Sequence, residues 1–325
     1  MSIENPQATK ASKAVAKQKF KLSTPEGRKK MKDAFSSPWA SAAAIIIAML
    51  WTIPTFGLLV TSFRPEKDIN ATGWWMFFVQ PNFTLENYES ALFQGTAVTP
   101  PLSQYFFNSF AITLPAAIFP LTLAVFAAYA LAWFDFRGKN FIFFSIFALQ
   151  VIPLQMSLVP LLQLFAKGLM IGEEVIIPPL GITGTYIPIW IAHTIFALPL
   201  AIFLMHNFLS QIPRELIEAA RVDGAGWFTL FRQIVFPLSV PAIASFAIFQ
   251  FLWVWNDLLV GLTFGGGVKD IAPLTVRLAE MVGTRGSNWE VLTAGAFISM
   301  IVPLIVFFAL QRYFVRGLLA GSVKG

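Results

Sequence analysis

Residues 212–237 read IPRELIEAARVDGAGWFTLFRQIVFP, and this polar stretch lies between two long apolar runs. No Asp, Glu, Lys or Arg occurs between Glu174 and Arg214 on one side, or between Arg232 and Asp257 on the other. A helix needs about 20 apolar residues to cross the hydrocarbon of a bilayer, and each run is long enough. The stretch is therefore interpreted as a connection between two membrane-spanning helices.

The same pattern recurs along the whole chain. Of 325 residues, 56% are hydrophobic and only 12% are charged. An ordinary cytosolic enzyme and a disordered chain are excluded, because a soluble domain of this length could not bury so much apolar surface. We predict an all-α integral membrane protein with six spans, at 39–62, 106–131, 141–163, 186–209, 238–260 and 291–312. Strands are not expected in these runs, because they lack the alternation of a membrane barrel.

Lys and Arg are unevenly distributed among the connecting segments. If the N-terminus is cytoplasmic, seventeen of them lie on inner segments and six on outer loops. Because inner loops carry such an excess, both termini are predicted to be cytoplasmic. Residues 1–38 form a basic N-terminal segment, interpreted as disordered or lying on the anionic inner leaflet. Residues 39–312 form the membrane domain, and 313–325 form a cytoplasmic tail.

The stretch at 212–237 is expected to fold as a helix, a turn and a second amphipathic segment. Pro213 suits the first turn of a helix, and Gly224 permits a turn that a Cβ atom would resist. Small residues at Ala219, Ala220 and Ala225 would let another protein approach closely. We interpret the stretch as a docking element. The alternative is an amphipathic loop that lies on lipid.

Fixed spacings in this stretch carry a family resemblance. Gly, Ile and Pro follow the Glu of a Glu-Ala-Ala triplet by six, sixteen and nineteen residues; the six positions are Glu218, Ala219, Ala220, Gly224, Ile234 and Pro237. The stretch thereby resembles the conserved cytoplasmic loop of ABC importer permeases, departing from it at Phe236, where Leu is usual.

Further segments relate the chain to a smaller group of permeases within this family. Trp255-Asn256-Asp257 and the ending from Gln311 to Gly325 look like motifs of maltose-type carbohydrate importers. The segment Pro153-Leu-Gln-Met156 and the stretch from Trp253 to Asp257 are similar to those of α-glucoside and glucosylglycerol permeases. The resemblance covers roughly residues 39–325 and leaves the basic leader unmatched.

This resemblance implies the ABC importer permease fold and a set of partners in a bacterial inner membrane. A second related permease would complete the pore as a heterodimer, an extracytoplasmic sugar-binding protein would deliver the sugar, and two ATPase subunits would bind the loop at 210–237. The implied coupling residues are Glu218, Ala219, Ala220, Asp223, Gly224, Ile234 and Pro237, and the implied tail contacts are Gly321, Ser322 and Lys324. ATP and Mg would bind to the ATPase partners, because this chain has no phosphate-loop motif. No cofactor, metal, catalytic residue or nucleic acid is expected on this chain.

Polar side chains inside the predicted spans are candidates for a substrate path. An unpaired amide is costly in lipid, so it usually faces protein or a cavity. A sugar site needs amides for hydroxyl groups and an aromatic face for the ring. The candidates are Asn108, Gln155, Gln250, Trp253 and Asn256. The alternative for each is a hydrogen bond between helices, which is also the interpretation preferred for His193 and His206.

Two rival functions remain open from the sequence. The same machine could carry glycerol phosphate or a polyamine, although the spans contain no Lys or Arg, and Asp257 is the only carboxylate near them. An ion-coupled secondary transporter would need buried carboxylates and internal repeats, and no convincing repeat is present. A neutral sugar carried by an ATP-driven importer is the preferred interpretation.

Overall fold

The computed structural model describes residues 38–95, 100–172, 174–265, 268–282 and 288–320, with side chains to residue 311. The long helices are α3 (Pro38–Ser62), α6 (Leu102–Trp133), α9 (Ile187–Leu209), α12 (Phe236–Trp255) and α15 (Trp289–Ala320). Among the described residues, five helices are long and apolar enough to cross a membrane, and a bent pair brings the number to six. The prediction of an all-α protein with six spans is confirmed.

Shorter elements connect these helices. They are α4 (Glu66–Ala71), the 3₁₀-helix η1 (Trp74–Phe78), α5 (Glu86–Phe93), α7 (Lys139–Leu149), α8 (Leu154–Lys167), β1 (Leu169–Ile171), β2 (Glu174–Ile177), α10 (Arg214–Val222), α11 (Trp227–Leu230), the π-helix η2 (Phe231–Val235), α13 (Leu259–Gly265) and α14 (Leu274–Val282). The strands form an antiparallel hairpin between α8 and α9. The sequence predicted only that this segment could not be one regular helix.

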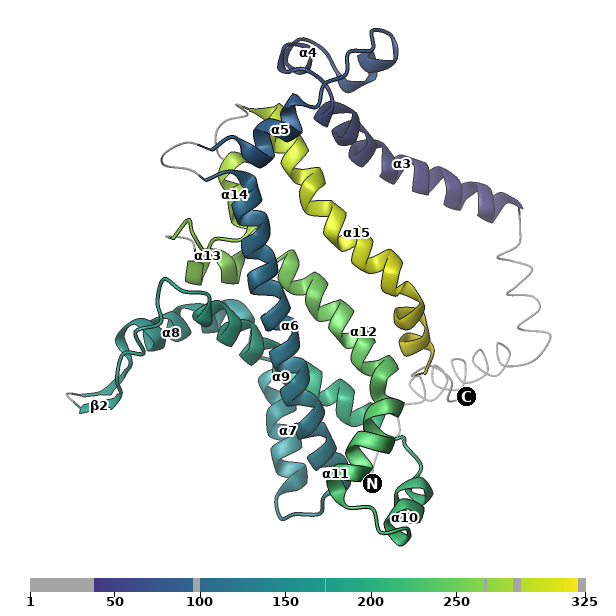
Figure 1. Cartoon of the computed structure of the whole chain (residues 1–325), viewed down its shortest axis with the longest axis vertical. Helices are drawn as coiled ribbons and strands as arrows, with labels where there is room; N and C mark the ends of the chain where they lie inside the picture. Colours follow the sequence, from purple (N-terminus) through teal and green to yellow (C-terminus); the bar gives the residue numbers. More distant parts are fainter. Residues whose placement is uncertain (1–37, 96–99, 173, 266–267, 283–287, 321–325) are drawn as a thin grey trace, which may run out of the picture.

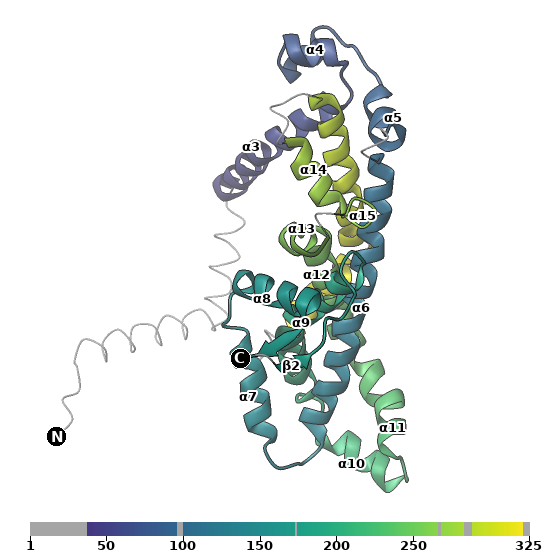
Figure 2. The same ribbon diagram turned by 90° about the vertical axis from the view of Figure 1, so that its left-hand side faces the viewer.

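The centre of the molecule is a layer of four helices. α6 packs along α9 and α12, and α12 packs on α15 (Figure 1). α15 also contacts α5, α14 and α3. α3 otherwise stands apart from the bundle (Figure 2), and its buried residues, Gly57, Val60 and Ser62, all lie in its second half.

Proline residues inside the spanning helices create carbonyl groups that need a donor. Pro115 of α6 has no N–H, so the carbonyl of Ala111, four residues earlier, lacks its helical partner. Trp190 of α9 supplies the donor, with its Nε1 atom 3.0 Å from the Ala111 oxygen. In a membrane no water is available to satisfy such a carbonyl, so the indole fixes α9 against α6.

The same arrangement occurs twice more. The further pairs are Gln250 with Ala116, four residues before Pro120, and Trp255 with Ser299, four residues before Pro303. Their donor–acceptor distances are 3.3 and 3.1 Å respectively. Both donors lie on α12, which is thereby attached to α6 on one side and to α15 on the other.

The third span, predicted at 141–163, is present as two helices that meet at a bend. α7 ends at Leu149, α8 begins at Leu154, and their axes meet at 99°. Pro153 is the cause, because proline disfavours a helical conformation in the residue before it and cannot donate to the preceding turn. Pro153 is extended and occupies the position that opens α8.

The fifth span also differs from its predicted limits of 238–260. It runs from Trp227 to Trp255, so the second amphipathic segment of the loop is the beginning of the spanning helix. The π-helical turn of η2 ends two residues before Pro237, whose missing N–H would leave a regular turn without one donor. The helix ends at Trp255, and after Asn256 the chain turns into α13.

A double-mutant cycle tests the first proline–indole pair. We expect Trp190→Phe to lower the free energy of unfolding by about 1–2 kcal/mol, because the Ala111 carbonyl loses its donor. Pro115→Ala restores a main-chain N–H, so the same Trp190→Phe change should cost less in that background. Denaturant unfolding of the detergent-solubilised protein measures both values. Equal costs in the two backgrounds would show that the indole does not serve this carbonyl.

Candidate functional site

A cavity of about 1300 Å³ lies beside the bend of the third span. Its walls come from α7 and α8 at the bend, from α9, from α12 and from the segment that follows α12. Because α8 turns away from α7, the space next to α9 and α12 is not filled by a continuous helix. The bend of the third span therefore creates the cavity.

Four of the five candidate substrate-path residues line this cavity. They are Gln155 on α8, Gln250 and Trp253 on α12, and Asn256 at the end of α12. Phe196, Phe246 and Phe249 add aromatic surface to the lining. The lining thus combines amide groups with aromatic rings in a mostly apolar wall, as small-molecule sites commonly do.

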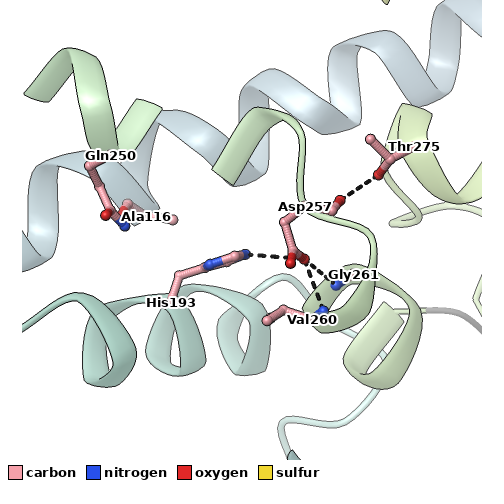
Figure 3. A network of polar contacts seen from close by, with 7 residues as sticks. All are labelled: Ala116, His193, Gln250, Asp257, Val260, Gly261 and Thr275. Carbon is pink, nitrogen blue, oxygen red and sulfur yellow. Dashed lines mark hydrogen bonds and ion pairs between the residues drawn. The ribbon is translucent and has the colours of Figure 1, made fainter. Parts of the chain in front are cut away.

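The amide side chains in the cavity lining differ in whether they already form hydrogen bonds within the protein. Gln250 is buried and spends one amide hydrogen on Ala116 (Figure 3). Asn256 donates to the carbonyl of Leu252 at 2.8 Å, which satisfies the last turn of α12. Among the described residues, Gln155 has no side-chain partner and is exposed to the cavity. Gln155 is therefore more available to a solute than Gln250 or Asn256, and Gln150, which also lines the cavity, is likewise exposed.

Asn108 lies outside the cavity. Its side-chain nitrogen donates to the carbonyl of Ala272 at 3.0 Å, and its oxygen accepts the hydroxyl of Tyr186 at 2.7 Å. The residue is buried, and both ends of its amide are occupied. This geometry fits the alternative that the sequence left open, a hydrogen bond between elements.

The Trp255-Asn256-Asp257 motif ends α12 and begins α13. Asp257 Oδ2 accepts the N–H groups of Val260 and Gly261 at 2.9 and 3.1 Å (Figure 3). The Asp257 carbonyl accepts the hydroxyl of Thr275 at 2.6 Å. The carboxylate of Asp257 therefore holds the start of α13, and its main-chain carbonyl holds the start of α14.

His193 is the second ionisable group in the cavity wall. Its Nε2 atom lies 3.8 Å from Oδ2 of Asp257, which brings α9 next to the motif (Figure 3). His206, thirteen residues later, instead lies against the ring of Phe143, with 4.3 Å between ring centres. Among the described residues, no three His, Asp or Glu side chains gather in a way that could hold a metal ion.

A second candidate site is the exposed corner between α10 and α11. Gly224 forms it with φ = +84°, a conformation that glycine adopts without steric cost. The N–H of Gly224 bonds to the carbonyl of Arg221, and that of Ala225 to the carbonyl of Ala220. The expected helix and turn of this loop are thus present in the structure.

The corner brings together some of the predicted coupling residues. Glu218, Ala219, Asp223 and Gly224 are exposed on it, and Ala220 is half-buried beneath them. Ile234 and Pro237 lie apart from the corner, on η2 and the first turn of α12. The tail residues Gly321, Ser322 and Lys324 lie outside the described residues, as does almost all of the basic segment 1–38.

Two named proteins are similar to this chain in sequence. The chain is 49% identical over 286 residues to the osmoprotective compounds uptake permease protein GgtD of a Synechocystis species, covering 87% of this chain and 90% of that one. It is 52% identical over 246 residues to the alpha-glucoside transport system permease protein AglG of Rhizobium meliloti, covering 75% of this chain. The match spans 61% of the length of AglG.

The fold and the family follow from two further comparisons. A membrane chain in the crystal structure of a bacterial alginate ABC transporter, in complex with a pentasaccharide-bound periplasmic protein, superposes with a TM-score of 0.61 at 14% identity, covering 86% of this chain and 95% of that chain. The fold is therefore that of an ABC transporter membrane subunit. Residues 120–319 match the family described as binding-protein-dependent transport system inner membrane component. Since this match covers more than half of the chain, the protein belongs to that family and is a multi-pass transport subunit of the inner membrane rather than an enzyme.

Proposed function

We propose that this chain forms half of the translocation pore of an ATP-driven importer for a neutral sugar, an α-glucoside or a related oligosaccharide. A second, related permease supplies the other half of the pore. Two ATPase subunits bind the α10–α11 corner, and an extracytoplasmic binding protein delivers the sugar. ATP and Mg bind to the ATPase partners.

The lining of the cavity is the observation that supports this cargo. Among the residues that line it, none is Lys or Arg, so a phosphate group would meet no cation. Asp257 is the one carboxylate in the lining, and its Oδ2 atom already accepts two main-chain N–H groups. A polyamine would therefore find no free carboxylate cluster. Amides and aromatic rings suit a neutral polyol better than either ion.

The names of two relatives also support the proposed neutral cargo. GgtD is described as a permease for osmoprotective compounds and AglG as a permease for alpha-glucosides. Membership of a family that depends on binding proteins disfavours the ion-coupled secondary transporter.

A transport assay tests the proposed cargo. We expect proteoliposomes that hold this chain with its second permease, ATPase and binding protein to accumulate α-glucosides in an ATP-dependent manner. Glycerol 3-phosphate and putrescine should not compete. Competition by either ion would contradict a neutral cargo, and uptake by this chain alone on an ion gradient would contradict the ATP-driven mechanism.

The role of the cavity in sugar transport can be tested by replacing lining residues. Gln155 and Trp253 are suitable, because neither side chain forms a hydrogen bond within the described part of the chain. We expect Gln155→Ala with Trp253→Ala to lower sugar uptake about tenfold, because one hydrogen bond and one aromatic face together contribute about 1.4 kcal/mol. Uptake is measured below saturation in reconstituted complexes.

The matched control is Gln163→Ala with Trp51→Ala. Both of these residues are exposed and lie outside the cavity lining. Equal losses in the two double variants, or dissociation of the complex by the first one alone, would remove Gln155 and Trp253 from the substrate path.

The corner of the loop can be tested through its backbone conformation. We expect Gly224→Val to abolish uptake while membrane insertion persists, because a branched side chain is strained at φ = +84° by about 1–3 kcal/mol. No atom lies within 4 Å of the position of the new Cβ, so the effect would come from the backbone. The measurement is sugar-stimulated ATP hydrolysis together with co-purification of the ATPase.

Gly226 provides the control in the same loop. Its φ of −73° suits any residue, and space around its Cβ position is also open. Gly226→Val should therefore retain most of the stimulated hydrolysis. Gly224→Asn should retain more than Gly224→Val, because asparagine tolerates positive φ. Wild-type stimulation in Gly224→Val would show that the corner does not couple the two subunits.

A further inference from the structure

α10 projects from the bundle at its predicted cytoplasmic end (Figures 1 and 2). Ile217 is the buried residue of α10 and packs in an apolar cluster with Leu230 of α11. A second contact is made by Arg221, whose guanidinium carbon lies 3.7 Å from the ring centre of Trp227. A cation over an indole face is attracted by the charge distribution of the ring. Arg221 and Trp227 therefore close the Gly224 corner and join α10 to α11.

Trp227 is in turn joined to α6. Its ring meets the ring of Phe134, the residue directly after α6, edge to face with 4.4 Å between centres. The hydroxyl of Tyr129, in the last turns of α6, donates to the Trp227 carbonyl at 3.0 Å. Tyr129 also packs on Phe134, with 5.6 Å between ring centres. Both the side chain and the main chain of Trp227 are thus held by the end of α6.

The connection from α11 to α12 is less regular than the contacts that hold α11 to α6. It runs through η2, where the regular helical hydrogen-bonding pattern is interrupted. Phe231, the first residue of η2, still packs on α6, with 5.1 Å between its ring centre and those of Phe126 and Tyr129. α11 is therefore fixed to α6 by aromatic contacts, whereas its link to α12 passes through an irregular turn.

We propose that Trp227 is the positioning residue through which a displacement of α10 reaches α6. Arg221 and Gly224 hold α10 to Trp227, and Tyr129 and Phe134 hold Trp227 to α6. α10, α11 and the end of α6 then move as one rigid body, and η2 is where this body turns relative to α12. This inference rests on the proposed function, because it assigns the path by which ATPase binding at α10 acts on the pore.

The competing explanation for Trp227 is lipid anchoring. Tryptophan is enriched where spanning helices meet the membrane surface, and Trp227 is about two-fifths exposed. Anchoring to lipid requires neither the cation of Arg221 nor the hydroxyl of Tyr129. The two explanations therefore predict different results for variants that alter only those groups.

The functional test separates ATP hydrolysis from uptake in the reconstituted complex. We expect Trp227→Ala and Arg221→Gln to lower sugar uptake about tenfold, a change typical of lost coupling between sites. ATP hydrolysis and co-purification of the ATPase should persist. Arg221→Lys keeps a cation over the ring and should restore much of the uptake, and Tyr129→Phe should lower it by removing one hydroxyl.

Phe136 offers the matched control. It is an exposed phenylalanine two residues after Phe134 and has no ring partner among the described residues. Phe136→Ala should therefore leave uptake unchanged. Uptake at the wild-type level in Trp227→Ala, or equal losses in Arg221→Lys and Arg221→Gln, would overturn the proposal and favour lipid anchoring.

A spectroscopic measurement tests the rigid body directly. The chain has no cysteine, so spin labels can be placed at Leu123→Cys on α6 and Val222→Cys on α10, both exposed positions. We expect the distance between the labels to remain the same with and without ATP in the otherwise unchanged chain. Trp227→Ala should broaden that distance distribution or shift it on addition of ATP.

The outcomes also distinguish this proposal from the proposed function. If the unmodified complex imports no sugar with ATP, the proposed function fails. If it imports sugar but the labels move apart on ATP binding, or Trp227→Ala leaves their distance unchanged, then only the rigid connection through Trp227 fails.

Discussion

The arrangement of the spanning helices depends on main-chain carbonyls that proline leaves without a donor. A bilayer offers no water to satisfy them, so a donor from a neighbouring helix is strongly favoured. Trp190 serves the carbonyl exposed by Pro115, Gln250 that exposed by Pro120, and Trp255 that exposed by Pro303. These bonds are directional, unlike the apolar contacts around them. They therefore fix the register of α9 and α12 against α6, and of α12 against α15.

The position of the cavity follows from the same constraint. Gln250 lines the cavity and bonds to α6, so the wall formed by α12 cannot rotate without breaking that bond. Trp255 holds the end of α12 against α15, and the chain then turns at Asp257, whose carboxylate organises α13. The motif that resembles sugar permeases thus has an architectural role, and it leaves Asn256 at the rim of the cavity.

The sequence predicted the spans well because length and the absence of charge are sufficient to define them. It could not decide whether Pro153 bends its span, since Pro115 and Pro199 also lie within predicted spans and their helices continue. Whether a proline breaks a helix depends on partners elsewhere in the fold. The same reason applies to Asn108: its partners Ala272 and Tyr186 lie 164 and 78 residues away in the sequence, so the sequence could not decide between a structural amide and a substrate contact. The corner at Gly224 is local, and local residue preferences were enough to predict it.

α6 connects to both candidate sites, although none of its residues lines the cavity. Towards its outer half it accepts the donors of Trp190 and Gln250, and at its other end it holds Trp227 through Tyr129 and Phe134. A movement that reaches the end of α6 is therefore applied to a helix already bonded to the cavity wall. α12 contacts both sites as well, but η2 interrupts it between them. A continuous helix transmits displacement along its axis better than one with an irregular turn, so α6 is the stiffer route from the exposed corner to the cavity.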